Sequence, residues 1–255
     1  MLTISIFTRE ENKKLLDLIS DLKKQSFSNF QIKIYSDKAF KLENIEIIET
    51  KWKNISQKRN LAINDCKTDF LFLLDDDNRI YNQDFLKNLF SYSDKIQEKH
   101  ILSPVIYWRD TEIIQSAGIR FCYILWKVFA NKKIKWDFWK TAGIWGNSLF
   151  WKTENFKKAS FDEEIWFIRE DIDYSYSLRE NWVKIFVVNK KINHQERDKT
   201  EAEKSFLVWE AYKRKIKNRN IFVKKHWNIL QKIAYWLIWY WLWIIYWKFI
   251  KLIKK

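Results

Sequence analysis

Three consecutive aspartates, Asp75, Asp76 and Asp77, directly follow the apolar run "FLFLL" at residues 70–74. Adjacent carboxylates repel one another, so three at the end of a buried strand cost free energy unless a cation or hydrogen-bond donors offset them. Carboxylate oxygens are the ligands that Mg²⁺ and Mn²⁺ prefer. The pattern predicts a divalent-cation site that also holds a diphosphate. The residues alone leave open a solvated, Asp-rich loop or helix cap.

A second acidic cluster, "REDIDYS", contains Glu170, Asp171 and Asp173. Carboxylates are common at the start of a helix because they complement its dipole, and this structural role stays open. A carboxylate also accepts the proton of a hydroxyl nucleophile as the new bond forms. Two separate acidic clusters therefore favour two roles, cation binding and general-base catalysis.

The residues around these clusters alternate between β-rich and amphipathic runs. We expect strands at residues 2–8, 30–37, 45–50, 69–77 and 101–108, and helices at 10–26, 56–66 and 82–96. This alternation predicts an α/β fold with a mainly parallel sheet and flanking helices. Ligands of such sheets bind at the carboxyl ends of the strands, where Thr8, Asp37 and the three aspartates fall.

Length and charge indicate one large domain with a tail, which we place at residues 1–210 and 211–255. Residues 211–255 contain twelve Lys or Arg and no Asp or Glu, so the first 210 residues carry a net charge of only +3. This near-neutral body argues against a nucleic-acid partner. Cys66 and Cys122 provide no disulfide framework or metal spacing, and no signal-peptide pattern opens the chain, so we expect a cytosolic body.

The order and spacing of several motifs across residues 2–195 resemble the family 2 glycosyltransferases of the GT-A fold. The matching elements are "TREEN", "SQKRNLAI", "FLLDDD", "AGIWGNSLFWKTENF", "FDEEIWFIREDIDYSYSLRENW" and "VNKKINHQE". The resemblance implies a GT-A fold, a nucleotide-sugar donor, transfer with inversion and dependence on Mg²⁺ or Mn²⁺. Processive synthases of this family carry Q-x-x-R-W, which "SLRENW" does not match, so we expect transfer of one sugar at a time.

The resemblance also assigns roles to single residues. It implies nucleotide-sugar contacts by Thr8, Glu10, Asp37, Arg59, Asp75 and Asp76. Asp77 would bind the metal, with His194 beside it. Asp171 would be the general base, Glu170 would orient acceptor or donor, and Asp173 would be structural.

The chain has 3 Gly and 16 Trp, the reverse of ordinary usage. Trp52 and Trp182 stand where the related proteins have glycine, and an indole side chain does not take the backbone conformations that glycine takes freely. We hypothesise that the gene uses UGA for glycine. The alternative is a Trp-rich lineage, and the codons at these positions distinguish the two.

Residues 233–247 carry no charge, are rich in Trp, Tyr, Ile and Leu, and have basic residues on both sides. Fifteen residues are short of the ~20 that span a bilayer. We therefore expect a helix lying in the cytoplasmic face of the cell membrane; a hairpin or single span comes second, and a helix packed on the domain third. The expected acceptor is a surface glycan or a lipid-linked saccharide.

Two other functions remain open from the residues. A nucleotidyltransferase that makes nucleotide-sugars would have a Gly-rich basic loop after the first strand, which "FTREENKK" lacks. A non-catalytic, membrane-bound adaptor would keep its function after Asp77→Asn or Asp171→Asn.

Overall fold

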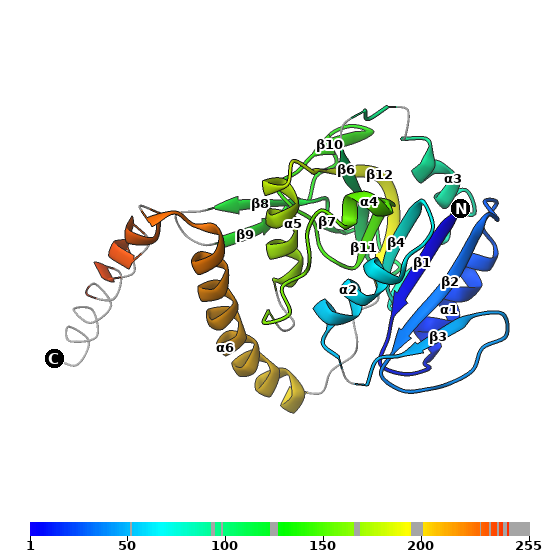
Figure 1. Ribbon diagram of the computed structural model, residues 1–255, viewed down its shortest axis with the longest axis horizontal. Helices are drawn as coiled ribbons and strands as arrows, with labels where there is room; N and C mark the ends of the chain where they lie inside the picture. Colours follow the sequence, from blue (N-terminus) through cyan, green and yellow to red (C-terminus); the bar gives the residue numbers. More distant parts are fainter. Residues whose placement is uncertain are drawn as a thin grey trace.

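A ten-stranded mixed sheet with helices packed on it forms the centre of the protein (Figure 1). This computed structural model describes residues 1–51, 53–92, 95–97, 99–122, 127–165, 169–194, 201–229, 231–234, 236–238, 240–241 and 244. The expectation of an α/β fold with a mainly parallel sheet is confirmed.

The first half of the chain builds a parallel block of four strands in the order β3-β2-β1-β4. These are β1 (Leu2–Phe7), β2 (Phe30–Ser36), β3 (Glu46–Glu49) and β4 (Phe70–Asp75). Helices α1 (Lys13–Lys23), α2 (Ile55–Asp65) and α3 (Phe85–Phe90) connect and cover them. Each lies inside or within a residue of its expected range. In the parallel register Phe7 pairs with both Tyr35 and Asp75, so three strands end at one edge.

The second half of the chain completes the sheet with strands of both directions. Strand β11 (Ser148–Lys152) runs antiparallel between β4 and β6 (His100–Trp108), and β12 (Lys184–His194) runs parallel to β6. Shorter strands β5 (Asn78–Arg79) and β10 (Phe138–Lys140) pair with β12, and β7 (Ile114–Ser116) pairs with β6. Strands β8 (Ile119–Cys122) and β9 (Lys127–Ala130) form a separate hairpin.

Local sequence explains where the helices begin. Asn12 caps α1 by accepting a hydrogen bond from the backbone N–H of Leu15. Asn54 and Gln57 form a reciprocal capping box at the start of α2. Strand β1 is buried along its whole length, as expected for a strand with helices on both faces of its sheet.

Helix α5 (Glu170–Glu180) ends in a motif that usually contains glycine. The N–H of Val183 donates to the carbonyl of Leu178, and the N–H of Trp182 donates to that of Arg179. Trp182 lies at the left-handed position of this pair with φ of 62°, and 86% of its surface is exposed. Glycine ordinarily fills this position. Trp52, the other residue of the glycine hypothesis, lies outside the described residues.

After the short helix α4 (Thr153–Phe156), α5 and β12, the chain continues into the long helix α6 (Glu201–His226), whose C-terminal end packs on α5. The boundary expected at residue 210 falls inside this helix. Phe222, Val223 and Trp227 are buried there against Phe121, Ile172 and Tyr176. The apolar segment 233–247 lies partly outside the described residues. Within the part that is described, no helix is both long and apolar enough to cross a membrane.

Candidate active site

Arg59 of α2 joins the two acidic clusters. Its Nη2 lies 3.1 Å from Asp75 Oδ1, and its Nη1 lies 3.1 Å from Glu170 Oε1. The guanidinium is only 2% exposed and lies between the rings of Phe7 and Phe161. A buried guanidinium is stable when carboxylates pair with it, as both do here. The end of β4 and the start of α5 therefore form one site, although 95 positions separate Asp75 from Glu170.

Gly146 brings the chain close to this guanidinium. A Cβ at this position would lie 2.6 Å from Arg59 Nη1, so any side chain would displace the arginine. The N–H of Gly146 donates to Asp171 Oδ2 over 3.1 Å, and the carbonyl of Asn147 accepts from the N–H of Asp75. The loop before β11 thus contacts both acidic clusters.

Asp76 is held by the end of β1 and the start of α1. Its Oδ2 accepts hydrogen bonds from Thr8 Oγ1 at 2.6 Å and from Asn12 Nδ2 at 2.8 Å. Burial raises the pKa of Asp76, and these two hydrogen bonds oppose the rise. Thr8 and Asp76, each expected to contact the nucleotide-sugar, are thus in direct contact, and Asn12 is a third member of this group.

Asp37 follows β2 and pairs with a buried lysine. Lys58 Nζ lies 2.7 Å from Asp37 Oδ1 and donates to the carbonyl of Thr8 at 2.8 Å. Asp37 is 7% exposed, so the ion pair fixes its position at the edge of the site. Glu10 is more peripheral: it is about half exposed and pairs with Lys38, which lowers the pKa of Glu10.

Asp77 and His194 lie together because β5 pairs with β12. Asn78, the residue after Asp77, is opposite His194 in this ladder, and His194 Nε2 lies 3.2 Å from Asp77 Oδ2. The other oxygen, Asp77 Oδ1, is buried and has no hydrogen-bond partner among the described residues. A buried carboxylate oxygen without a donor is costly, and a cation would satisfy it.

These two residues fit a divalent metal that takes its other ligands from substrate. Among the described residues, no group of three or more His, Cys, Asp or Glu side chains forms a complete metal site. Mg²⁺ usually keeps several waters and binds through one or two carboxylates plus substrate phosphates. Asp77, with His194 beside it, matches that pattern.

Asp75 and Asp171 hold their protons more tightly than free carboxyl groups do. Burial raises the pKa of Asp75 to about 6; Arg59 opposes the rise and Asp77 adds to it. Burial and then Glu170 raise the pKa of Asp171 to about 7, which Arg59 and the N–H of Gly146 oppose. Perturbed carboxylates at the end of a sheet are typical of functional sites.

Sequence reasoning missed three residues of this site. Asn12 could have been predicted from the sequence, since an Asn before a run of helical Leu residues is a common N-cap. No sequence pattern predicts Lys58 or Gly146, because their roles depend on partners far away in the chain.

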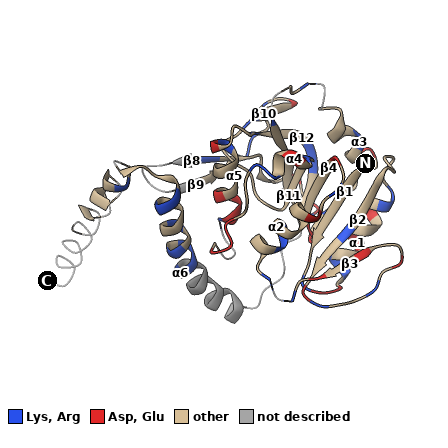
Figure 2. Cartoon of the chain, in the orientation of Figure 1, with Lys and Arg blue, Asp and Glu red and all other residues tan. Residues whose placement is uncertain are grey.

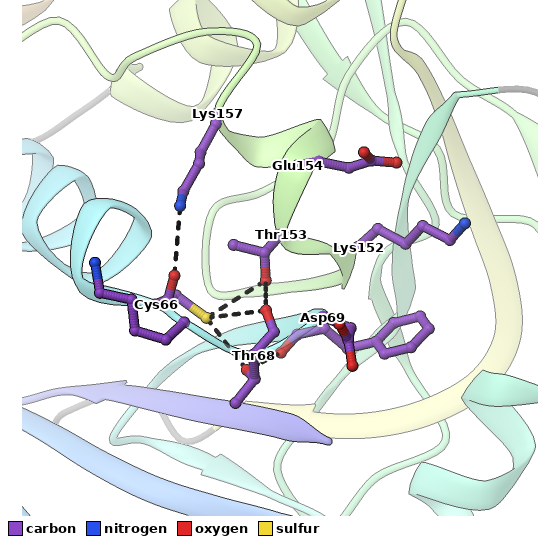
Figure 3. Close-up of a pocket in the computed structure, with 9 residues that line it drawn as sticks. Cys66, Thr68, Asp69, Lys152, Thr153, Glu154 and Lys157 are labelled. Atoms are coloured by element: carbon purple, nitrogen blue, oxygen red, sulfur yellow. Dashed lines mark hydrogen bonds between the residues drawn. The ribbon is translucent and has the colours of Figure 1, made fainter.

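A cavity of about 630 Å³ opens elsewhere, beside Phe70 at the beginning of β4 (Figure 3). Since β4 runs from Phe70 to Asp75, this cavity lies at the opposite end of the strand from the carboxylates. Its polar groups bond to one another, as in the 2.7 Å hydrogen bond from Thr153 Oγ1 to the carbonyl of Thr68. We assign it no part in the site.

Similarity to solved structures identifies the fold of this chain. A structure of GalNAc-T7 with UDP, GalNAc and Mn²⁺ is similar with a TM-score of 0.65 and 15% identity, over 77% of this chain and 44% of that one. The chain has the GT-A fold. TarS of S. aureus matches with a TM-score of 0.58 and 16% identity, over 92% of this chain and 47% of that one. A fragment of TarS in complex with UDP-GlcNAc matches with a TM-score of 0.55 and 17% identity, over 78% of this chain and 59% of that one.

The chain therefore spans less than two thirds of the length of each of these GT-A structures. No protein-family model matches the sequence, and no curated protein matches it. At this level of identity the likeness establishes the fold, and the expectation of a GT-A fold is confirmed.

Proposed function

We propose that this protein is a glycosyltransferase that transfers one sugar from a nucleoside-diphosphate sugar to an acceptor hydroxyl, with inversion. The observation that carries the proposal is the Arg59 bridge, which brings a strand-end aspartate triplet and a second carboxylate pair together on a GT-A sheet. The titles of the similar structures support the donor class, since they name UDP, UDP-GlcNAc, GalNAc and Mn²⁺.

On the donor side, the ends of β1, β2 and β4 present the groups that would hold the nucleotide-sugar. Thr8 and Asp76 are bonded to each other, and Asp37 lies beside them through Lys58. Arg59 orients Asp75 at this edge, and Glu10 lies at the exposed rim. Asp77, with His194, would hold Mg²⁺ or Mn²⁺, which would neutralise the charge of the departing diphosphate.

On the acceptor side, Asp171 would accept the hydroxyl proton as the new C–O bond forms. A pKa of about 7 suits a general base at neutral pH, because the group is ionised often enough to act and basic enough to take the proton. Its Oδ2 is bound to the N–H of Gly146 and its Oδ1 to that of Ile172. Glu170, fixed by Arg59, would orient the acceptor or donor next to it.

A donor screen tests the proposal directly. UDP-, GDP- and dTDP-sugars are incubated with the protein and Mn²⁺ or Mg²⁺, and release of the nucleoside diphosphate is measured with water and with added saccharides as acceptors. We expect one donor to give turnover and Asp171→Asn to lower it by about 10²–10⁴-fold while donor binding is kept. Exposed Glu164 supplies the matched control, Glu164→Gln. Full turnover in Asp171→Asn would refute the assignment.

We also propose that the C-terminal tail attaches the enzyme to the cytoplasmic face of a membrane, where the acceptor is a glycan or a lipid-linked saccharide. Figure 2 shows Lys and Arg along α6, and residues 211–255 contain no acidic side chain. Several apolar side chains beyond α6 are more than half exposed: Ile229, Trp236, Leu237, Tyr240 and Trp241. Basic charge next to exposed apolar surface suits an anionic lipid surface.

Cosedimentation with vesicles tests this attachment. We expect binding to vesicles of anionic phospholipid that weakens at high salt, and loss of binding when residues 229–255 are removed. Equal binding to neutral and anionic vesicles, or unchanged binding by the shortened chain, would refute it.

A further inference from the structure

Helix α5, which carries Glu170 and Asp171, is held on its outer side by the end of α6. Asp173 has no exposed surface, and it accepts hydrogen bonds from Lys225 Nζ and His226 Nε2, both at 2.8 Å. A buried carboxylate is stable only with such partners, and removing one leaves an uncompensated charge. Both partners come from consecutive residues in the last turn of α6.

Lys225 also forms ion pairs with two carboxylates at once, one before α5 and one within it. Its Nζ lies 3.1 Å from Asp162 Oδ2 and 2.8 Å from Asp173 Oδ2. Burial opposes its charge, but the hydrogen bonds and attraction of these two carboxylates raise the pKa of Lys225. His226 Nδ1 lies 2.9 Å from Glu180 Oε2, so the contact extends to the far end of α5. Figure 2 shows acidic residues on α5 and on the segment before it.

Apolar packing adds to these ion pairs at Ile172, the residue between the proposed base Asp171 and the ion-paired Asp173. Ile172 packs against the cluster of Phe222 and Val223, on α6, and Trp227, the residue after it. Asp171 contacts the N–H of Gly146, while Ile172 and Asp173, the next two residues, contact α6. A shift of the end of α6 would therefore move the backbone that carries Asp171. Misplacement of a reacting group by about 1 Å can reduce a rate by roughly 10²-fold.

We propose that Lys225 and His226 are positioning residues for the sugar-transfer step: through Asp173 they hold Asp171 at the acceptor hydroxyl. Neither side chain touches the reacting atoms, and Arg59 holds the same helix from the inner side through Glu170. The inference rests on the proposed function and deepens it, because it makes α6 part of the acceptor side of the site.

Steady-state kinetics of the full chain test this role. The variants are Lys225→Met, which keeps the length of the stem without its charge, Lys225→Arg, which keeps the charge, and the control Lys224→Met at the exposed neighbouring residue. Release of nucleoside diphosphate is measured with the most active donor of the screen, with water as acceptor. Affinity for the same donor is measured by calorimetry.

We expect Lys225→Met to lower kcat by tenfold or more, while the donor dissociation constant changes by less than about twofold. We expect Lys225→Arg to recover kcat to within about threefold of the wild type, and Lys224→Met to match the wild type. His226→Gln gives a second measurement, with a smaller loss of kcat in the same direction.

Three results would overturn the proposal. An unchanged kcat in both Lys225→Met and His226→Gln would show that α6 does not position the base. A parallel loss of donor affinity and kcat would assign the pair to the fold as a whole. A wild-type protein that binds a donor but turns none over would refute the proposed function itself, and the inference with it. Only the first two results leave wild-type turnover intact, so the two failures are distinguishable.

Discussion

Replacement of Arg59 with methionine removes the positive charge between the acidic clusters while keeping most of the side-chain volume. At pH 8 it leaves Asp75 and Glu170 without the guanidinium that each contacts at 3.1 Å. Removing one partner of a buried ion pair costs about 3–5 kcal/mol, out of a total free energy of unfolding of roughly 5–15 kcal/mol. We therefore expect a folded but much weakened protein at pH 8.

The loss should be smaller at pH 5, and the sign follows from the raised pKa values. A carboxyl group whose pKa is raised by folding stabilises the folded state fully below its unfolded pKa of about 4, and this contribution is lost as pH rises through the folded pKa. For Asp75 and Asp171 the folded values are about 6 and about 7. Arg59 lowers both, so its removal raises both further, and both groups are largely protonated at pH 5 with or without it.

Urea unfolding followed by circular dichroism at pH 5 and pH 8 measures this difference. We expect the destabilisation by Arg59→Met to be greater at pH 8, by about 1.4 kcal/mol for each unit by which the two pKa values rise. Arg79→Met is the matched control, because Arg79 pairs with Asp21 at 2.6 Å and is not a partner of Asp75 or Glu170. An equal loss at the two pH values, or a loss below about 1 kcal/mol at pH 8, would refute the reasoning.

Three further predictions concern the metal, the base and the turn after α5. Asp77→Asn should weaken Mn²⁺-dependent binding of the nucleoside diphosphate identified by the donor screen by at least about tenfold, since a neutral amide is a poorer cation ligand. Calorimetry with and without Mn²⁺ checks this, with Asp69→Asn at the other end of β4 as control. Turnover should rise with pH through about 7 and then level off, because Asp171 must be ionised to accept a proton, and a pH–kcat profile that falls over this range would contradict the assignment. Trp182→Gly should raise the free energy of unfolding by about 1 kcal/mol, because it relieves a left-handed backbone costing roughly 1–2 kcal/mol, and the 86% exposed side chain gives up little buried surface. Exposed Trp136, without positive φ, supplies the control Trp136→Gly, which should be neutral or destabilising.

The parallel half of the fold could be predicted from the sequence because local residue patterns specify its strands and helices. The run "FLFLL" before Asp75 predicts a buried strand, and β4 is that strand. The leucines of α1 recur at helical spacing and are buried at Leu15, Leu18 and Leu22. Such signals need no knowledge of distant partners.

The second half of the fold was harder to predict from the sequence, because its short strands form by pairing with segments far away in the chain. Strand β5 has two residues and exists through its pairing with β12, more than a hundred positions later. Within the site, the position of the aspartates at a strand end could be predicted from the residues, whereas the roles expected of Arg59 and His194 come only from the resemblance. The bridge from Arg59 to Glu170 joins residues 111 positions apart, and no periodicity encodes it.

Strand β11 points against its two neighbours, β4 and β6. In a uniformly parallel sheet every strand ends at the same edge. Here β11 begins at that edge instead, and Gly146 and Asn147 are the last residues of the loop before it. The loop can thus vary in length or side chains at its outer turn while its inner end stays registered against Asp75 and Asp171. Under the proposed function, selectivity for different acceptors could therefore diversify in this loop without disturbing the strands proposed to hold the donor.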